Sequence, residues 1–527
     1  MARDSGNRPV FDQPAAGTLT HDEPPPGLRV SDDRSFFGHP AGLSTLFFTE
    51  MWERFAYYGL RPLLVLFMTA AITSGGFGFE RRTASAIVGV YAACVYLASL
   101  PGGWVADRWL GLRRAIWYGA ILIALGQIAV ALSVLFARPL FFVGLFLIVL
   151  GTGLLKPNIS AIVGDLYPEG GARRDAGFSI FYMGINIGAL VAPLVTGFLG
   201  ERVGWAWGFG AGGVGMLLGL ATYYFLAGKT LGPIGVTPST TDPREQAKVK
   251  TWLAVGLGVV SVVAALAMAG AIRLDAVKIA ESMSYVMLAL ALGYFAYLFI
   301  AGGLTGDEKR RTVVIIVLFL FATIFWSAFE QAPTSLNLFA RDYTDRTVFG
   351  WEMPTLWLQA FNSVFVIVLA PVFAALWVGL GRRGLDLSSP AKFSAGLFFA
   401  GLGFIVMWAA SNAVIAGGGN GVRVSPWWLI GSFFLQTLGE LSLSPVGLSS
   451  MTKLAPRKFA GQMMGVWFMA AALGNLIAGL VGGNVDPENL QQMPALFLRT
   501  SISLFVATAV LALLAIPIRR MMARVAS

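Results

Sequence analysis

Two acids and a base lie close together in a stretch of sequence that is otherwise apolar enough to cross a membrane. Glu50, Glu53 and Arg54 are followed by Tyr57 and Tyr58, at positions i, i+3, i+4, i+7 and i+8. This spacing places all five side chains on one face of a helix. Each charge costs about 2.5–3.5 kcal/mol at the centre of a membrane helix on insertion scales. The spacing therefore predicts a polar helix face that is presented to the interior of a helical bundle.

Four further ionisable side chains occur inside apolar segments. Lys156, Glu330 and Glu440 each lie in a different segment, and Arg61 follows the first cluster by two helical turns. Seven lipid-exposed charges would cost around 20 kcal/mol, so they must pair or line a wet cavity. Four acids face three bases, and one carboxyl therefore lacks a basic partner. In a low-dielectric cavity such a carboxyl is expected to bind a proton near neutral pH, which predicts proton coupling.

The ionisable residues also divide between the two halves of the chain. Arg54 and Lys156 belong to the N-terminal half, whereas Glu330 and Glu440 belong to the C-terminal half. A zwitterion with a carboxylate at one end and an ammonium at the other would bridge them through charge-assisted hydrogen bonds. Alternatively, the two acids satisfy structural partners. Aromatic residues that could form tolerant side-chain pockets are Trp326, Phe329 and Trp467, of which the last could equally be a packing residue.

Composition places these residues in a polytopic membrane protein. The chain has 527 residues, of which 56% are hydrophobic and only 13% are charged, and a soluble domain would be nearer a quarter charged. Long apolar runs predict an all-α membrane protein with fourteen transmembrane helices. They cover about 40–70, 84–106, 114–135, 139–165, 176–199, 206–228, 251–272, 283–304, 312–340, 354–381, 391–417, 426–453, 460–482 and 493–518.

Several function classes are disfavoured by the same sequence. The net charge of +10 comes from basic residues in short loops, as the positive-inside rule expects, and does not indicate nucleic-acid binding. The two histidines, His21 and His39, lie at or before the start of the first span, so a histidine metal site is not expected. We find no metal-ligand cluster, no nucleophile with a membrane histidine and no phosphate-binding glycine loop, and therefore do not expect an enzyme.

The loops and tails predict the organisation of the chain. Residues 1–38 are polar and proline-rich and are expected to form a disordered cytoplasmic tail. We expect six-helix bundles over 39–228 and 311–520, a linker with two additional transmembrane helices over 229–310, and a short cytoplasmic tail over 521–527. Basic loops fall on one side of this arrangement, so both termini are predicted to be cytoplasmic.

A weak internal repeat supports two related halves. Pro157 and Pro168 are eleven residues apart, as are Pro445 and Pro456, and a basic turn follows each pair. Parallel repeats of this kind build the major facilitator bundle, which has its site between the halves. The loop from Gly103 to Arg114, with its Asp-Arg pair, resembles the loop signature of that superfamily.

The sequence as a whole resembles the proton-dependent oligopeptide transporters, the peptide-transporter family of the major facilitator superfamily. The run from Glu50 to Tyr58 (E-x-x-E-R-F-x-Y-Y) matches the family's most specific motif. The segments that begin at Gly151, Phe178, Gly439 and Gly465 also match, and the similarity spans about residues 40–520. One departure is Ser363 after Asn362, where proline is common in the family.

The resemblance implies three groups of site residues. Proton coupling is implied for Glu50, Glu53, Arg54, Lys156 and Glu330. Peptide binding is implied for Arg54, Tyr57, Tyr58, Tyr96, Lys156, Asn186, Asn362, Glu440, Ser444 and Trp467. Gating is implied for Arg61 with Glu330 and for Arg81 with Asp342.

The expected function is proton-coupled import of di- and tripeptides by alternating access. The alternative is proton-coupled transport of another small anion, peptidomimetic or drug. No cofactor or metal is expected, since the proton is the coupling ion. The resemblance further implies a monomer that crosses a bacterial inner membrane many times.

Overall fold

The computed structural model describes residues 33–526 except 241, 384, 386, 420 and 484–489. Within this part of the chain the seven-residue helix α10 (Asn337–Tyr343) follows α9, and fourteen longer α-helices match the fourteen predicted segments. The longer helices are α1 (Ala41–Thr69), α2 (Arg81–Val105), α3 (Leu112–Ser133), α4 (Arg138–Asp165), α5 (Gly171–Phe198), α6 (Trp205–Thr230), α7 (Pro243–Met268), α8 (Ala276–Ile300), α9 (Gly306–Phe329), α11 (Ala360–Arg382), α12 (Ser389–Ala416), α13 (Trp427–Leu454), α14 (Ala460–Gly482) and α15 (Gln492–Ala526).

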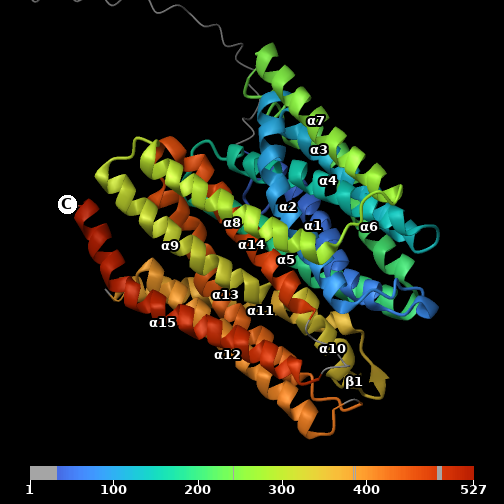
Figure 1. The fold of residues 1–527 in the computed structure, drawn as a ribbon. Helices are drawn as coiled ribbons and strands as arrows, with labels where there is room; N and C mark the ends of the chain where they lie inside the picture. The colour runs from blue at the N-terminus through green and yellow to red at the C-terminus, as the bar shows by residue number, and fades with distance from the viewer. Residues whose placement is uncertain are drawn as a thin grey trace, which may run out of the picture.

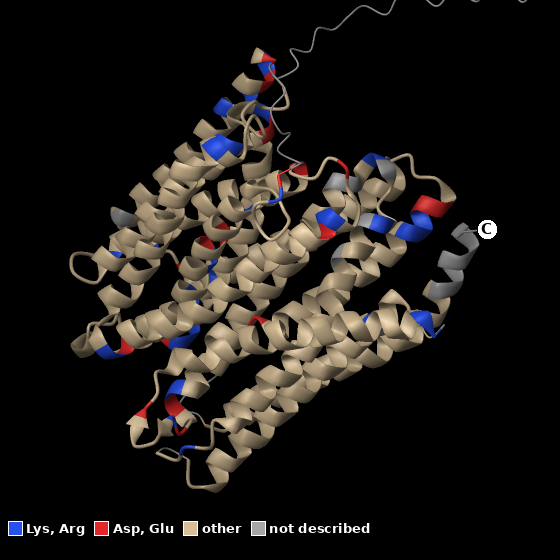
Figure 2. Ribbon diagram, turned by 180° about the vertical axis from the view of Figure 1, so that it is seen from behind, with Lys and Arg blue, Asp and Glu red and all other residues tan. Residues whose placement is uncertain are grey.

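The predicted fold class is confirmed by the length and composition of these helices. Twelve spans in the described part of the chain are long and apolar enough to cross a membrane. The remaining two long helices, α1 and α13, include five of the seven ionisable side chains singled out above: Glu50, Glu53, Arg54 and Arg61 on α1, and Glu440 on α13. Figure 2 shows the consequence: charged residues gather at the two ends of the helices, and a few lie in the otherwise uncharged interior.

The helices pack in two groups. In the first, α1 packs against α5 and α6, and α4 packs against α2 and α3; in the second, α12 packs against α13 and α15, and α9 packs against α14. Contacts between α2 and α14 and between α5 and α11 join the groups. Of the two helices between them, α8 packs against α2 and α14, whereas α7 lies at the edge of the bundle (Figure 1).

The two ends of the bundle differ. One end, which we call the hairpin end, carries α10 and a short antiparallel hairpin of β1 (Thr347–Val348) and β2 (Trp351–Glu352). The opposite end, which we call the termini end, carries the start of α1 and the last turns of α15 (Figure 1). Three short helices, η3 (Ala106–Leu110), η4 (Leu199–Val203) and η6 (Thr355–Gln359), extend or precede the long ones.

The parts of the predicted tails that the structure describes lie at the termini end. Most of the N-terminal tail, residues 1–32, falls outside the described residues. Within the rest, the Asp33 carboxylate accepts hydrogen bonds from the backbone N–H groups of Ala41 (2.7 Å) and Ser35 (2.9 Å). The His39 ring lies 2.8 Å (Nδ1) from the Tyr167 hydroxyl. These contacts fix the entry into α1, and at the other terminus α15 continues to Ala526.

Candidate functional site

The predicted polar face of α1 is buried and internally paired. Glu50, Glu53 and Arg54 are all almost inaccessible. The Arg54 guanidinium forms ion pairs with Glu53 and with Glu50, the latter at 3.2 Å between Nε and Oε1. It also lies over the Tyr57 ring, 5.2 Å from the ring centroid. The Tyr57 ring in turn contacts the Tyr58 ring, with centroids 5.3 Å apart. All five residues of the motif therefore form one connected cluster on the helix that the spacing predicted to carry a polar face.

Lys156 approaches this region from α4. Its Nζ lies 4.6 Å from the centroid of the Tyr96 ring on α2, a cation–π contact. Within the described part of the chain it makes no ion pair. An ammonium group without an ionic partner remains available for a ligand carboxylate or for a carboxylate of α1 after rearrangement.

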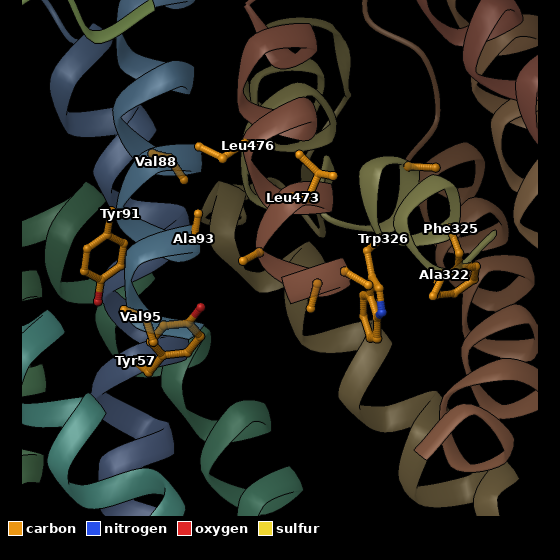
Figure 3. Close-up of a cluster of buried hydrophobic side chains, with 14 of the residues drawn as sticks. Tyr57, Val88, Tyr91, Ala93, Val95, Ala322, Phe325, Trp326, Leu473 and Leu476 are labelled. Atoms are coloured by element: carbon orange, nitrogen blue, oxygen red, sulfur yellow. The ribbon is translucent and has the colours of Figure 1, made fainter. Parts of the chain in front are cut away.

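A cavity of about 170 Å³ lies between the two groups of helices. Eight of the predicted residues line it: Tyr57, Tyr58, Arg61, Tyr96, Asn186, Glu330, Asn362 and Glu440. Trp326 and Phe329, expected as pocket aromatics, also line it. The indole Nε1–H of Trp326 is buried and has no partner within the described residues. In Figure 3 the Tyr57 and Trp326 rings project from different helices, on opposite sides of the packed core.

The side of the cavity formed by α11 and α13 is acidic. Asn362 donates from Nδ2 to the Thr437 hydroxyl (3.0 Å) and to Glu440 Oε2 (3.4 Å). Glu440 has no basic partner among the described residues, so it is the acid left over from the count of charges. The sequence could not identify which of the four carboxyls this would be, because pairing depends on how the helices face each other.

The hairpin end of the cavity is closed by contacts between the groups of helices. Arg61 Nη1 lies 2.5 Å from Glu330 Oε2, and Arg61 Nη2 donates to Asn475 Oδ1 on α14 at 2.5 Å. Asn337 Nδ2 donates to the carbonyl of Pro62 at 2.7 Å. The structure thus brings together the Arg61–Glu330 pair that the resemblance implied.

A second layer lies closer to the surface of the hairpin end. Arg81 Nη1 lies 2.6 Å from Asp342 Oδ2, as expected for the second pair, and Arg341 also binds Asp342 through Nε at 2.8 Å. Below it, α2 and α14 meet backbone to backbone at Gly89 and Gly479. A Cβ on Gly89 would lie 2.8 Å from the Asn475 carbonyl oxygen, so larger side chains do not fit.

Four predicted peptide-binding residues lie outside the cavity lining. Two of them, Arg54 and Lys156, contact the rings of the lining residues Tyr57 and Tyr96; the other two are Trp467 and Ser444. Trp467 is buried against α13, where a Cβ on Gly447 would lie 2.2 Å from its ring. Ser444 is half-buried on α13. In turn, sequence reasoning missed Tyr182 and Gln436, which line the cavity. Gln436 follows from α13 helical spacing, four residues before Glu440; no comparable signal marks Tyr182.

Comparisons with known proteins agree with this geometry. Residues 113–493 match the family model described as PTR2, POT family. The chain is 51% identical over 494 residues to the peptide transporter YePEPT of Yersinia enterocolitica, covering 93% of this chain and 96% of that protein. It is 38% identical to a di-/tripeptide transporter of Lactococcus lactis subsp. cremoris over 92% of this chain and 95% of the relative.

A solved structure shows the same architecture. The crystal structure of peptide transporter POT in complex with sulfate superposes with a TM-score of 0.85 at 41% identity, covering 92% of this chain and 96% of that one. Family model, curated relatives and fold all agree. The chain therefore belongs to the POT family, the proton-dependent oligopeptide transporters.

Proposed function

We propose that this protein is a proton-coupled symporter that imports di- and tripeptides by alternating access. One observation carries the proposal: Lys156 and Glu440 lie in opposite groups of helices, and neither forms an ion pair with the described residues. Glu440 lines the cavity, and Lys156 contacts the ring of Tyr96, which also lines it. An unpaired acid at the cavity and an unpaired base behind its opposite wall fit the ammonium and carboxylate of a short zwitterionic peptide. The names of the relatives, peptide transporter and di-/tripeptide transporter, support this substrate class.

The carboxylate end of the peptide is assigned to the N-terminal side of the cavity. Tyr57, Tyr58 and Tyr96 line that side, and their hydroxyls supply donors. Arg54 and Lys156 lie behind the lining, against the rings of Tyr57 and Tyr96, and supply positive charge. The amino end is assigned to Glu440, oriented by Asn362. Asn186, Ser444 and Trp467 are retained as proposed peptide contacts, of which Asn186 lines the cavity in this conformation.

Proton coupling is assigned to the α1 cluster with Lys156 and Glu330, as the family resemblance implies. Glu440, the carboxyl without a basic partner among the described residues, is instead assigned to the amino end of the peptide. In the structure Arg54 is shared between Glu50 and Glu53. Protonation of one of these carboxyls weakens its hold on Arg54, which can then bind the carboxylate of the peptide. Inward movement of each proton supplies roughly 2.3 kcal/mol per 100 mV of membrane potential.

Alternating access is assigned to the contacts at the hairpin end. The ion pairs Arg61–Glu330 and Arg81–Asp342 join the two groups of helices there. Residues 39–228 and 311–520 would move as six-helix bundles linked by 229–310. We further propose that the hairpin end faces outward, that both termini are cytoplasmic in a bacterial inner membrane, and that the protein is monomeric.

Another small anion, a peptidomimetic or a drug remains the second candidate substrate class. Glu440 argues for a ligand that carries an amine, because an anion without one would leave this buried acid uncompensated. A phosphonate or carboxylate analogue of a dipeptide would provide an anion for the basic side of the cavity and an amine for Glu440. Such an analogue belongs to this second class.

Competition experiments in proteoliposomes test the substrate assignment. Uptake of radiolabelled dialanine should be inhibited by trialanine but not by alanine or N-acetyl-dialanine, which lacks the ammonium. Glu440→Gln should weaken dialanine competition by roughly tenfold or more. The matched control is Glu352→Gln, at an acid of the hairpin end outside the cavity. Equal inhibition by dialanine and N-acetyl-dialanine would contradict the role of Glu440.

A further inference from the structure

A second hollow lies on the other side of α9 from the peptide cavity. It has a volume of about 650 Å³ and is lined by residues of α9, α14 and α15 and of the segments next to them. Ser327 and Gln331 line it, whereas their neighbours Trp326 and Glu330 line the peptide cavity. The end of α9 therefore separates the hollow from the peptide cavity, and each is lined by a different face of it. The proposed transport mechanism makes no use of this hollow. We call it the α15 groove.

The α15 groove faces the membrane near one surface. Its polar residues on α15 are Gln492, Arg499, Thr500 and Ser503, which fall on one helical face. Arg499 lies seven residues after the start of α15, about 10 Å along the helix. The sequence from Ser501 to Ile518 contains no charge. Arg499 thus marks the boundary between headgroups and hydrocarbon at the hairpin end.

The surroundings of α15 indicate that this face contacts lipid. The helix packs against α12 and α9 of its own group. Arg499 and Ser503 are nevertheless exposed, although they lie in a span apolar enough to cross a membrane. An exposed face on a peripheral membrane helix contacts lipid, and an arginine there needs a partner that the bilayer can supply.

The hydrogen-bonding state of the groove indicates which partner fits. Arg499 forms no ion pair with the described residues, so its five N–H donors are available for an anion. The hydroxyls of Ser327, Thr500 and Ser503 donate to backbone carbonyls at 2.8, 3.0 and 2.9 Å. Their protons are therefore engaged, and they offer only acceptor lone pairs to a ligand. The Thr500 oxygen already accepts one hydrogen bond, from Gln331 Nε2 at 3.4 Å, and keeps one lone pair for a ligand. A fitting ligand carries an anionic group beside a hydrogen-bond donor.

The groove also has an apolar wall suited to an acyl chain. Ile324 of α9, Ile477 and Val481 of α14, and Leu504 of α15 line it. Arg499 and the hydroxyls thus occupy the same groove as a continuous aliphatic surface. This combination matches a phospholipid: phosphate, polar headgroup and hydrocarbon chain.

We propose that the α15 groove is a binding site for a phospholipid whose headgroup donates hydrogen bonds. The phosphate binds Arg499, the headgroup donor binds the hydroxyl oxygens of Thr500 and Ser503, and one acyl chain lies along the aliphatic wall. The ammonium of ethanolamine and the hydroxyls of glycerol both provide the donor. The quaternary ammonium of choline has neither an N–H nor an O–H and leaves the acceptors unused.

Native mass spectrometry of the delipidated full-length protein tests the site. The protein is titrated with phosphatidylethanolamine, phosphatidylglycerol or phosphatidylcholine of identical acyl chains. The first two should bind roughly fivefold more tightly than phosphatidylcholine. Equal binding of all three would overturn the proposal. Binding of phosphatidylglycerol alone would show that net charge selects the lipid and would contradict the role of the headgroup donor.

Variants separate the two parts of the site. Arg499→Gln should weaken binding of all three lipids, whereas Arg499→Lys should retain it. The double variant Thr500→Val with Ser503→Ala should abolish only the preference over phosphatidylcholine. The matched control is Arg423→Gln, at an exposed arginine of the hairpin end that pairs with Glu352, and it should bind like the wild type. Wild-type lipid binding by folded Arg499→Gln would refute the assignment.

Discussion

Arg61 of α1 and Glu330 at the end of α9 form a buried ion pair of 2.5 Å between the two groups of helices. Both side chains are less than a tenth exposed. Arg61 is also bound by Asn475, so a single arginine connects α1, α9 and α14 at the hairpin end of the cavity. In the proposed cycle this contact must break each time the hairpin end opens.

Removal of one partner of this pair should destabilise the protein more than removal of both. Arg61→Met or Glu330→Gln alone leaves one buried group without its partner, which costs about 3–5 kcal/mol in comparable pairs. The double variant Arg61→Met with Glu330→Gln leaves no unpaired charge and should recover part of this loss. Thermal unfolding of the four proteins in the same detergent measures the effect. Additive losses in the double variant would mean that the two side chains act independently.

Glu53→Gln should separate peptide transport from the proton gradient. The amide keeps the size of the side chain but cannot gain or lose a proton, and it still accepts a hydrogen bond from Arg54. Gradient-driven uptake of dialanine should therefore disappear, whereas counterflow, which needs no net proton movement, should persist. Loss of both activities in a folded variant would assign Glu53 a structural role.

A side chain inserted between α2 and α14 should hold the hairpin end open. Gly89→Leu places carbon atoms where the backbone of Gly479 now lies, with the nearest atom of that residue 2.9 Å from the Cβ position. A cysteine at Gln359, which lines the cavity, reports the change in a Cys94→Ser background. Labelling from outside by an impermeant maleimide should increase several-fold.

The control for Gly89→Leu is Gly256→Leu. Gly256 lies on α7 and has no atom within 4 Å of its Cβ position, so a side chain there meets open space. It should leave both labelling and uptake unchanged. Unchanged labelling in Gly89→Leu would show that the hairpin end does not close through this contact.

The entry into α1 should lose stability in mild acid. Burial, followed by the charge of Arg173, lowers the pKa of His39 below its ordinary value near 6.5. The folded protein therefore favours neutral His39, which contributes its full stabilisation above the unfolded pKa and loses it as pH falls towards the folded pKa. Between pH 8 and pH 5 the melting temperature of the wild type should fall more than that of His39→Gln. Identical falls would exclude this contribution.

Much of the fold could be predicted from the sequence because each long helix corresponds to a continuous apolar segment. All fourteen predicted segments correspond to helices. The i, i+3, i+4 spacing of Glu50, Glu53 and Arg54 placed them on one helical face, where the structure has Arg54 paired with both acids. Such relationships are local, since the geometry of a single helix fixes which residues share a face.

Contacts between side chains of different helices could be predicted only through the family resemblance, and some could not be predicted at all. The Arg61–Glu330 pair joins positions far apart in the chain, and nothing in either local sequence specifies the partner. The third member, Asn475, was not identified, because an asparagine in a long apolar helix has many possible roles. For the same reason Tyr182 was missed, and the unpaired acid could not be assigned to Glu440 before the helices were placed.

Uptake driven by an imposed proton gradient tests the central claim most directly. Proteoliposomes that contain the purified protein, with the lumen more alkaline than the medium, are supplied with radiolabelled dialanine. Dialanine should accumulate above equilibrium. This accumulation should collapse when a protonophore is added and should be absent without the gradient. Uptake at the same rate and extent with and without the gradient would contradict proton-coupled peptide transport.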